Sequence, residues 1–422
     1  MPPRHLTWNP DGSATFAGAP VAGLASAFGT PLYLFDEADL RERLAAYADA
    51  FGARNVAYAA KAFLTGKVLQ LAADAGSMVD VVSEGELEFC LRSGFPGERI
   101  VMHGLHKPPS ALRTALGAGV GRIVLESEGE IAELAKVARA ERREAQVLLR
   151  LAPAVDAKTH PSLSTGSPAS QFGVPVADGQ ARAAVEAIRA ERGALNLLGY
   201  HVHIGSQIEE LDAFAQGAAV VLGFARHVEA ETGFRPAELD FGGGLGIGPH
   251  APSPAVLHEA LSDAVAQGLP GGPPPRLLAE PGRYIAGPPG VTVYRIVQRK
   301  RAADGRTYLI VDGGMSDGPR PALYGARPDV AVTPRRAGAE RLDIAGMHCE
   351  SGDIVRRDVE VSPAQVGDLL IVLDTGAYNH SMASHYNRVA IPPVVFVAEG
   401  VARPATRRDN LADWLRLEVR QG

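Results

Sequence analysis

A lysine directly follows a short apolar run, Tyr58-Ala59-Ala60-Lys61. A lysine amine that is shielded from water at the end of a strand loses its proton more readily and can form a Schiff base with a carbonyl compound. A lysine in this place more often serves as a solvated cap of the strand. The chemistry of Lys61 therefore depends on the groups that the fold brings beside it.

Two histidines, His201 and His203, lie two residues apart. Both imidazoles therefore point to the same face of a strand. Such a pair can bind a metal, or one ring can stack on a planar cofactor while the other packs. A metal site needs further ligands from other strands, and His103 and Asp80 do not stand at a spacing typical of one. We expect no metal.

Residues 242–244 are three glycines that follow the run ending at Phe241. A backbone without side chains lets N–H groups approach an anion such as a phosphate closely. A tight turn without any ligand has the same composition. The glycines are therefore a candidate phosphate site at the end of a strand.

These residues need a fold that brings strand ends together. From about Asp36 to Gly282, eight apolar or β-branched runs alternate with amphipathic stretches of helical period. This alternation predicts a (β/α)8 barrel, in which catalytic groups project from the carboxyl ends of the strands. The strands are expected near residues 55–60, 78–83, 99–104, 122–127, 146–152, 196–203, 238–242 and 276–281. Their ends carry Lys61, Asp80, His103, Arg150, His201, His203, the glycines and Glu280.

After Gly290 the pattern changes to short apolar runs separated by Gly, Pro and Asp turns. Few stretches of helical period remain, which predicts a β domain. We expect the barrel over residues 31–285 and the β domain over residues 286–422. We expect the N-terminal residues 1–30 to belong to the β domain.

The composition excludes several classes of protein. With 422 residues, 46% hydrophobic and 21% charged, the chain is typical of a folded protein of two or three domains. No apolar run is long enough to span a membrane, and Met1–Pro10 lacks the core of a signal peptide. Two cysteines exclude a disulfide framework and favour the cytoplasm. The net charge of −6, without a basic stripe, predicts no nucleic-acid partner.

Eight motifs follow one another in the chain. They are Tyr58-Ala59-Ala60-Lys61-Ala62, Asp80-Val81-Val82-Ser83, His201-Val202-His203-Ile204-Gly205-Ser206-Gln207, Asp240-Phe241-Gly242-Gly243-Gly244, Glu280-Pro281-Gly282-Arg283, Arg320-Pro321-Ala322-Leu323-Tyr324, Cys349-Glu350-Ser351-Gly352-Asp353 and Gly376-Ala377-Tyr378. With them the chain resembles the diaminopimelate decarboxylases, a family of pyridoxal 5'-phosphate (PLP)-dependent decarboxylases with an alanine racemase-like fold. The resemblance runs from about Gly29 to Asn387.

The resemblance implies the decarboxylation of meso-2,6-diaminopimelate to L-lysine and CO2, the last step of lysine biosynthesis. It places PLP on Lys61 and implies an anion, Glu280, facing the pyridine nitrogen, which favours the protonated ring and makes it a strong electron sink. The residues expected to contact the cofactor are Lys61, Asp80, His203, Ser206, Gly243, Gly244, Glu280, Gly282, Arg283 and Tyr378.

The resemblance also implies how the substrate is handled. Cys349 would protonate the substrate carbon after CO2 leaves. The residues expected to bind the substrate are Arg283, Arg320, Tyr324, Glu350 and Tyr378. In the family the active site is shared within a homodimer, with Cys349 and Glu350 supplied by the partner.

Other functions of the same fold remain open. Arg283 and Arg320 favour a substrate with a second carboxylate, because arginine binds one at two points. Glu350 and Asp317 would instead suit the distal cation of ornithine or arginine, and carboxynorspermidine or a carrier-tethered substrate are further options. A racemase of this fold usually has an arginine where Glu280 stands. A non-catalytic PLP-binding protein would not need the motif at residues 349–353, and the presence of the whole motif argues against it. A metal-dependent barrel hydrolase is the remaining alternative.

Overall fold

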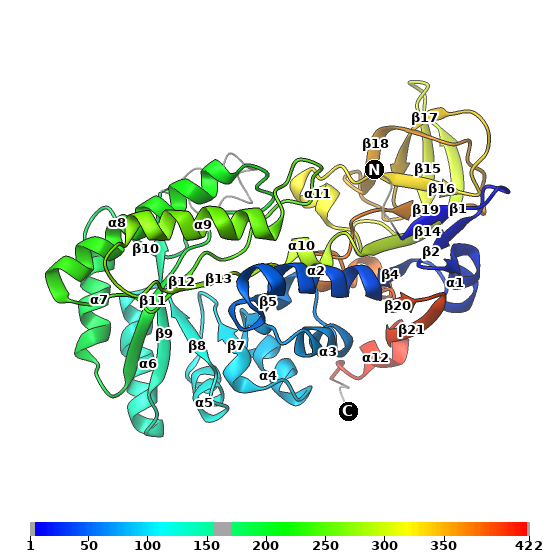
Figure 1. The fold of residues 1–422 in the computed structure, drawn as a ribbon. Coiled ribbons are helices and arrows are strands. Elements are labelled where there is room, and N and C mark those ends of the chain that lie inside the picture. Colours follow the sequence, from blue (N-terminus) through cyan, green and yellow to red (C-terminus); the bar gives the residue numbers. More distant parts are fainter. Residues whose placement is uncertain (1–4, 155–169, 420–422) are drawn as a thin grey trace. The chain divides into compact units, whose positions relative to one another are not determined.

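The computed structural model describes residues 5–154 and 170–419, which form two compact units (Figure 1). One unit comprises residues 42–285, and the other comprises residues 1–41 together with residues 286–422. The first is built from alternating strands and helices, and the second mainly from strands.

The unit of residues 42–285 is a closed barrel of eight parallel strands. Neighbouring strands pair in chain order, with β10 (Val174–Pro175) added to the side of β9. A parallel bridge between Val56 and Ala279 joins the first and last strands and closes the barrel. The eight strands are β5 (Ala57–Ala59), β6 (Met78–Val81), β7 (Ile100–Met102), β8 (Arg122–Leu125), β9 (Ala145–Ala152), β11 (Leu195–His201), β12 (Glu238–Asp240) and β13 (Arg276–Leu278). The predicted eight-stranded barrel is confirmed.

Helices separate the barrel strands along the chain. Several begin at a hydroxyl residue that accepts a hydrogen bond from a backbone N–H of the first turn, as Ser83 does from Glu86 and Ser127 from Glu130. These helices are α3 (Gly66–Asp74), α4 (Glu84–Arg92), α5 (Pro109–Gly117), α6 (Glu128–Glu141), α7 (Gln180–Ala190), α8 (Leu211–Thr232) and α9 (Pro254–Gly268). The helix α2 (Glu37–Phe51) precedes the first strand, and α10 (Arg283–Ala286) follows the last.

The amino ends of three barrel strands are tied by an ion cluster in which Arg122 and Glu238 are buried and Arg276 is exposed. Arg122, the first residue of β8, contacts both carboxylate oxygens of Glu238, the first residue of β12, at 2.6 Å. Arg276, the first residue of β13, contacts the same carboxylate at 3.0 Å. In barrels of this kind the amino-end face serves stability and the carboxyl-end face carries the chemistry.

The second unit is centred on a large sheet. Its longest strand, β14 (Gly290–Arg301), pairs with β15 (Thr307–Val311), with β19 (Leu369–Val372) and with β4 (Leu32–Asp36). The other strands of this sheet are β16 (Val330–Thr333), β17 (Glu340–Ala345), β18 (Ile354–Val361), β20 (Val394–Ala398) and β21 (Val401–Thr406). A small sheet is formed by β1 (Leu6–Trp8), β2 (Ala14–Phe16) and β3 (Ala19–Pro20), and the helices are α1 (Val21–Phe28), α11 (Arg320–Tyr324) and α12 (Leu411–Leu415).

The strand β4 lies in this second unit, although it falls inside the range 31–285 expected for the barrel. It pairs antiparallel with β14 and parallel with β20. All five of its residues are buried, which is typical of a strand in the middle of a sheet. A run buried on both faces suits either kind of sheet, so its pattern alone does not assign it to the barrel.

Among the described residues, no helix combines the length and the apolar character needed to cross a membrane.

Candidate active site

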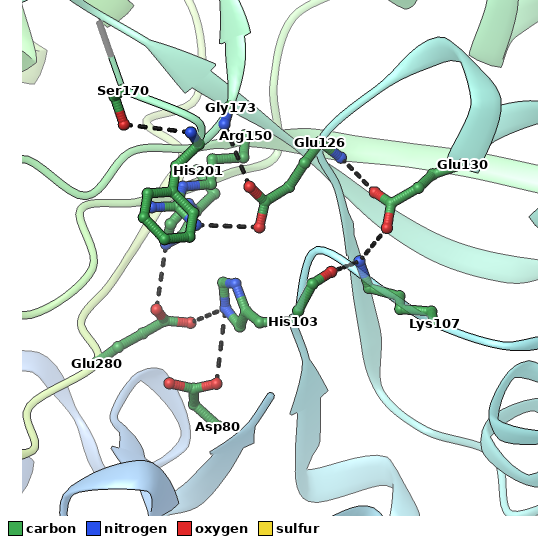
Figure 2. Close-up of polar contacts among 12 residues, drawn as sticks. Asp80, His103, Lys107, Glu126, Glu130, Arg150, Ser170, Gly173, His201 and Glu280 are labelled. Carbon is green, nitrogen blue, oxygen red and sulfur yellow. Dashed lines mark hydrogen bonds and ion pairs between the residues drawn. The ribbon is translucent and has the colours of Figure 1, made fainter. Parts of the chain in front are cut away.

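Six ionisable side chains meet at the carboxyl ends of the barrel strands (Figure 2). All of them are buried. They are Asp80 in β6, His103 after β7, Glu126 after β8, Arg150 in β9, His201 at the end of β11 and Glu280 after β13. Because a buried charge is costly without a partner, the contacts within this group decide which of them stay ionised.

Glu280 lies between two imidazoles. Its Oε1 is 2.6 Å from Nε2 of His103, and its Oε2 is 3.1 Å from Nε2 of His201. Burial alone would raise the pKa of Glu280, but the two histidines, which make hydrogen bonds to it and favour its charged form, hold that pKa well below its usual value. Glu280 is therefore an anion in the interior of the barrel.

His201 and His203 are held without charge at neutral pH. Burial lowers the pKa of His201 to about 4, so at neutral pH this ring offers Glu280 an N–H donor rather than a positive charge. Burial, followed by the charges of Lys61 and Arg150, lowers the pKa of His203 well below its usual value. A neutral ring at His203 suits stacking on a planar group.

Lys61 lies in a short 3-10 turn, Ala60–Ala62, directly after β5. Its Nζ is 3.4 Å from Oδ2 of Asp80, whose side chain is fully buried. Burial raises the pKa of Asp80, and the charges of Lys61 and His103 counteract that rise. The structure thus brings the candidate nucleophile beside the predicted cofactor residue Asp80.

A chain of ion pairs continues from Arg150 (Figure 2). Nη1 of Arg150 lies 3.0 Å from Glu126, and the guanidinium stacks 4.7 Å from the ring centroid of Phe172. Glu130 accepts a hydrogen bond from the backbone N–H of Glu126 and contacts Lys107 at 2.8 Å. Burial would raise the pKa of Glu126, but the charge of Arg150 lowers it below its usual value. These contacts fix Arg150 at the carboxyl ends of the barrel strands, which we call the rim.

The glycine turn follows β12 and leaves no room for side chains. A Cβ on Gly243 would lie 2.3 Å from the backbone oxygen of Glu280, and one on Gly244, whose φ is +110°, would lie 2.3 Å from the backbone oxygen of Gly205. The N–H of Gly243 donates to Nδ1 of His203 at 3.3 Å. This bond orients the imidazole and leaves its proton on Nε2.

Ser206 and Arg283 meet on the same rim. Nε of Arg283 donates to Oγ of Ser206 at 3.1 Å, and the guanidinium is buried. Gly282 lies beside the first strand, because a Cβ there would lie about 3 Å from the side chains of Ala59 and Ala62. The barrel therefore gathers the predicted cofactor residues around one end, from Lys61 to Arg283.

This set of groups fits PLP. The amine of Lys61 would hold its aldehyde, and the neutral imidazole of His203 would lie on its ring face. The glycine turn, which has no side chains, would hold its phosphate together with the hydroxyl of Ser206. The buried anion would face its ring nitrogen. The fit rests on Glu280 in particular, because a buried carboxylate kept ionised by two imidazoles suits a cationic pyridinium partner.

Sequence reasoning overlooked several residues of this rim. Asp240 is buried, and burial together with the charge of Glu280 raises its pKa well above the usual value. Its position directly before Phe241 and the glycines was a usable signal. Lys107, Glu126 and Glu130 follow no motif, and only the closed barrel reveals their contacts.

The remaining predicted site residues belong to the unit of residues 1–41 and 286–422. Arg320 and Tyr324 are the first and last residues of α11, and being four apart they share one face of that helix. Tyr378 is half-buried with a φ of +60°. Cys349 and Glu350 are both exposed.

The turn that carries Cys349 is anchored by its neighbours. Asp353 accepts hydrogen bonds from the backbone N–H groups of Met315 and His348, at 2.7 and 2.9 Å. The ring of His348 lies between Oγ of Ser316 and Oδ1 of Asn387, at 2.8 and 3.1 Å. Cys349 is thus exposed on a turn whose backbone is held by the hydrogen bonds of Asp353 and His348.

The barrel unit is similar to a known protein family. Residues 37–287 match the family described as pyridoxal-dependent decarboxylase, pyridoxal binding domain. The closed barrel, the rim of residues around Lys61 and this match define the class: a pyridoxal-dependent decarboxylase.

Relatives along the whole chain narrow the assignment. Diaminopimelate decarboxylase of Mycobacterium tuberculosis is 43% identical, over 99% of this chain and 97% of its own. That of Bacillus subtilis is 38% identical, over 97% and 96%. The crystal structure of diaminopimelate decarboxylase from M. jannaschii in complex with L-lysine superposes with a TM-score of 0.93 at 30% identity, over 99% of this chain and 98% of that one. The chain belongs to the diaminopimelate decarboxylase family.

Proposed function

We propose that this chain uses PLP to decarboxylate meso-2,6-diaminopimelate to L-lysine and CO2. The observation that carries the proposal is the ionised carboxylate of Glu280, buried between His103 and His201 at the same rim as Lys61. Whole-chain relatives named diaminopimelate decarboxylase support the substrate. The M. jannaschii relative is described in complex with L-lysine, the expected product.

The barrel residues would hold the cofactor. Lys61 would carry it, the ring of His203 would lie on its face, and Ser206 with Gly243 and Gly244 would bind its phosphate. When bound, PLP takes up the electrons of the bond that breaks as CO2 leaves. Glu280 would keep the ring nitrogen protonated, because an anion beside that nitrogen favours the charged ring.

Binding of the substrate and return of the proton would fall to the other unit. Arg320 and Tyr324, on one face of α11, would bind the distal carboxylate of diaminopimelate, which arginine grips at two points. The thiol of Cys349 would donate a proton to the carbon that lost CO2. L-lysine would then be released, and the thiolate of Cys349 would regain a proton from solvent.

Asp317 argues against a distal cation. Tyr294 donates to its Oδ2 at 2.5 Å and the backbone N–H of Gly314 donates to its Oδ1 at 3.0 Å, while only 1% of the residue is exposed. A carboxylate enclosed in this way is not available to a substrate amine. This weakens the ornithine or arginine alternative.

A substrate assay tests the function directly. The purified protein with PLP is offered meso-diaminopimelate, ornithine, arginine and lysine separately while CO2 release is followed. We expect release from diaminopimelate at a kcat/KM at least about a hundredfold above the others, because an unpaired charge in the wrong substrate costs several kcal/mol. Activity on ornithine with none on diaminopimelate would contradict the proposal.

We further propose a cytoplasmic homodimer in which Cys349 of the partner subunit completes the site. The exposed position of Cys349 on an anchored turn supports a thiol that acts beyond its own unit. Two free cysteines suit a reducing compartment. No described residue contact defines the dimer, so the test is functional.

Mixed dimers distinguish a shared site from a site within one chain. The variants Lys61→Ala and Cys349→Ala are each inactive as pure proteins under the proposal. Co-refolded in equal amounts, random pairing gives about half mixed dimers with one intact site each, and hence about a quarter of wild-type activity. Absence of recovery in mixtures that native mass spectrometry shows to contain mixed dimers would overturn the shared site.

A further inference from the structure

His103 and His201 reach Glu280 from strands that are not neighbours. In the sheet, β8 and β9 separate β7 from β11, so the two rings meet across the barrel interior. Their centroids are 4.7 Å apart, and each directs Nε2 at a different oxygen of Glu280 (Figure 2). A carboxylate with one donor on each oxygen is fixed in orientation.

We propose that His103 and His201 are positioning residues that together hold Glu280 as an oriented anion toward the ring nitrogen of the bound cofactor. The inference rests on the proposed function, in which Glu280 faces that nitrogen. The two histidines act through Glu280, so their effect depends on what the carboxylate faces.

The surrounding charges explain why two imidazoles are needed. Asp80 is a second buried carboxylate, 4.0 Å from Nε2 of His103, and its own cationic neighbour is Lys61 at 3.4 Å. Asp240 is a third buried carboxylate, and burial together with the charge of Glu280 raises its pKa well above the usual value. With the imidazoles removed, burial and the neighbouring Asp80 would favour a protonated Glu280, which could not act as an anion.

A purely structural role predicts something different. If His103 and His201 only joined distant strands, their loss would weaken binding of any cofactor-shaped molecule alike. If they act through Glu280 on the ring nitrogen, their loss matters only for a ring that has that nitrogen. An analogue of PLP with carbon in place of the ring nitrogen separates these cases.

The experiment measures binding of PLP and of the carbon analogue to the full-length chain freed of cofactor. The variants are His103→Ala and His201→Ala. The matched control is His106→Ala, on the same loop after β7 but exposed. We expect each of the first two to weaken PLP binding by about tenfold or more, the scale of one charge-assisted hydrogen bond, and to change analogue binding by less than about twofold. The control should change neither.

Two outcomes would overturn the inference: equal weakening for both molecules, or no weakening for either. Should an alanine variant fold poorly, His103→Gln and His201→Gln offer an amide N–H of similar reach and should restore most of the PLP affinity. The double alanine variant should lose less than the product of the single losses, since both act on one carboxylate. Binding needs no substrate, so a failure of diaminopimelate turnover would overturn the proposed function without altering this comparison.

Discussion

Two buried carboxylates in this molecule have opposite pKa shifts. Glu280 in the barrel and Asp317 in the other unit are 6% and 1% exposed, so both are removed from water. Glu280 faces two imidazoles, and its pKa is held well below the usual value. Asp317 accepts hydrogen bonds from the neutral groups Tyr294, Gly314 and Ser316, and burial raises its pKa to about 6.

The difference shows that the partners of a buried acid, and not burial itself, decide in which direction its pKa shifts. The two imidazoles that contact Glu280 favour its charged form and keep it available as an anion. Hydroxyl and amide donors stabilise the ion of Asp317 too weakly to offset desolvation. The first arrangement suits chemistry, and the second fixes a loop.

The largest effect should come from Lys61, where the barrel's chemistry is concentrated. Lys61→Ala is expected to abolish CO2 release and the near-visible absorbance of bound cofactor. Borohydride treatment of the wild type should fix the cofactor on the peptide that contains Lys61, as mass spectrometry would show. An unchanged absorbance band in the variant would mean that another lysine carries PLP.

Charge removal at the two carboxylates tests the comparison directly. Glu280→Gln should lower kcat by about 10²–10³, the usual cost of losing one preorganised electrostatic contact. Asp317→Asn should lower the melting temperature and leave kcat/KM within a few-fold, because Asp317 holds a loop through neutral partners. Steady-state kinetics and thermal unfolding of both variants provide the measurement, and equal losses of kcat would remove the distinction.

Arg320 carries the argument for a dicarboxylate substrate. Arg320→Ala should weaken diaminopimelate binding by about one to two orders of magnitude, since a charge-assisted hydrogen bond contributes roughly 1.5 to 3 kcal/mol. The absorbance of bound cofactor should stay unchanged. Arg320→Lys should restore part of the affinity, because an ammonium lacks the planar two-point contact. A kcat/KM within about twofold of wild type in the alanine variant would place Arg320 outside the substrate site.

The smallest effect is the pH dependence of stability, where the two acids should differ in sign. The folded pKa of Asp317 is about 6 and its unfolded value is near 3.8, so folding takes up a proton between these pH values. Its contribution to stability therefore falls as pH rises from about 4 to 6. Glu280 has a lowered folded pKa, so its contribution is present above about 4.5 and is lost as pH falls further.

Urea unfolding from pH 3 to 7 measures these slopes. Asp317→Asn should flatten the curve between about pH 4 and 6, by at most about 3 kcal/mol over that window. Glu280→Gln should flatten it below about pH 4.5. The slope and not the absolute stability is decisive, because an amide at either position also loses hydrogen bonds. The same slope in Asp317→Asn as in wild type would contradict the raised pKa.

The sequence predicted the barrel and most of its rim for a simple reason. In a parallel barrel every strand ends on the same face, so alternation alone places Lys61, Asp80 and Glu280 together. It could not show which of them touch. His103 and Glu280 are 177 residues apart, and their contact depends on the closure and radius of the barrel.

The assignment of β4 could not be predicted for a related reason. The run Leu32–Asp36 is apolar throughout, so it fits a barrel strand or a central sheet strand equally well. Its partner β14 begins more than 250 residues later, beyond the reach of any local pattern. Likewise the contacts that run from Arg150 through Glu126 and Glu130 to Lys107 could not be predicted. These are residue types that usually lie on the surface, and only the tertiary structure brings them together.

The ion cluster at the amino ends of the barrel has a consequence for synthesis on the ribosome. Arg122 leaves the ribosome 116 residues before its partner Glu238, a delay of roughly ten seconds at typical elongation rates. The open edge of β5 waits longer still, until Ala279 arrives to bridge Val56. A nascent chain or truncated fragment that stops before Ala279 therefore exposes an unpaired strand edge, and one that stops before Glu238 also leaves Arg122 uncompensated. We expect such chains to bind chaperones until the last strand is made.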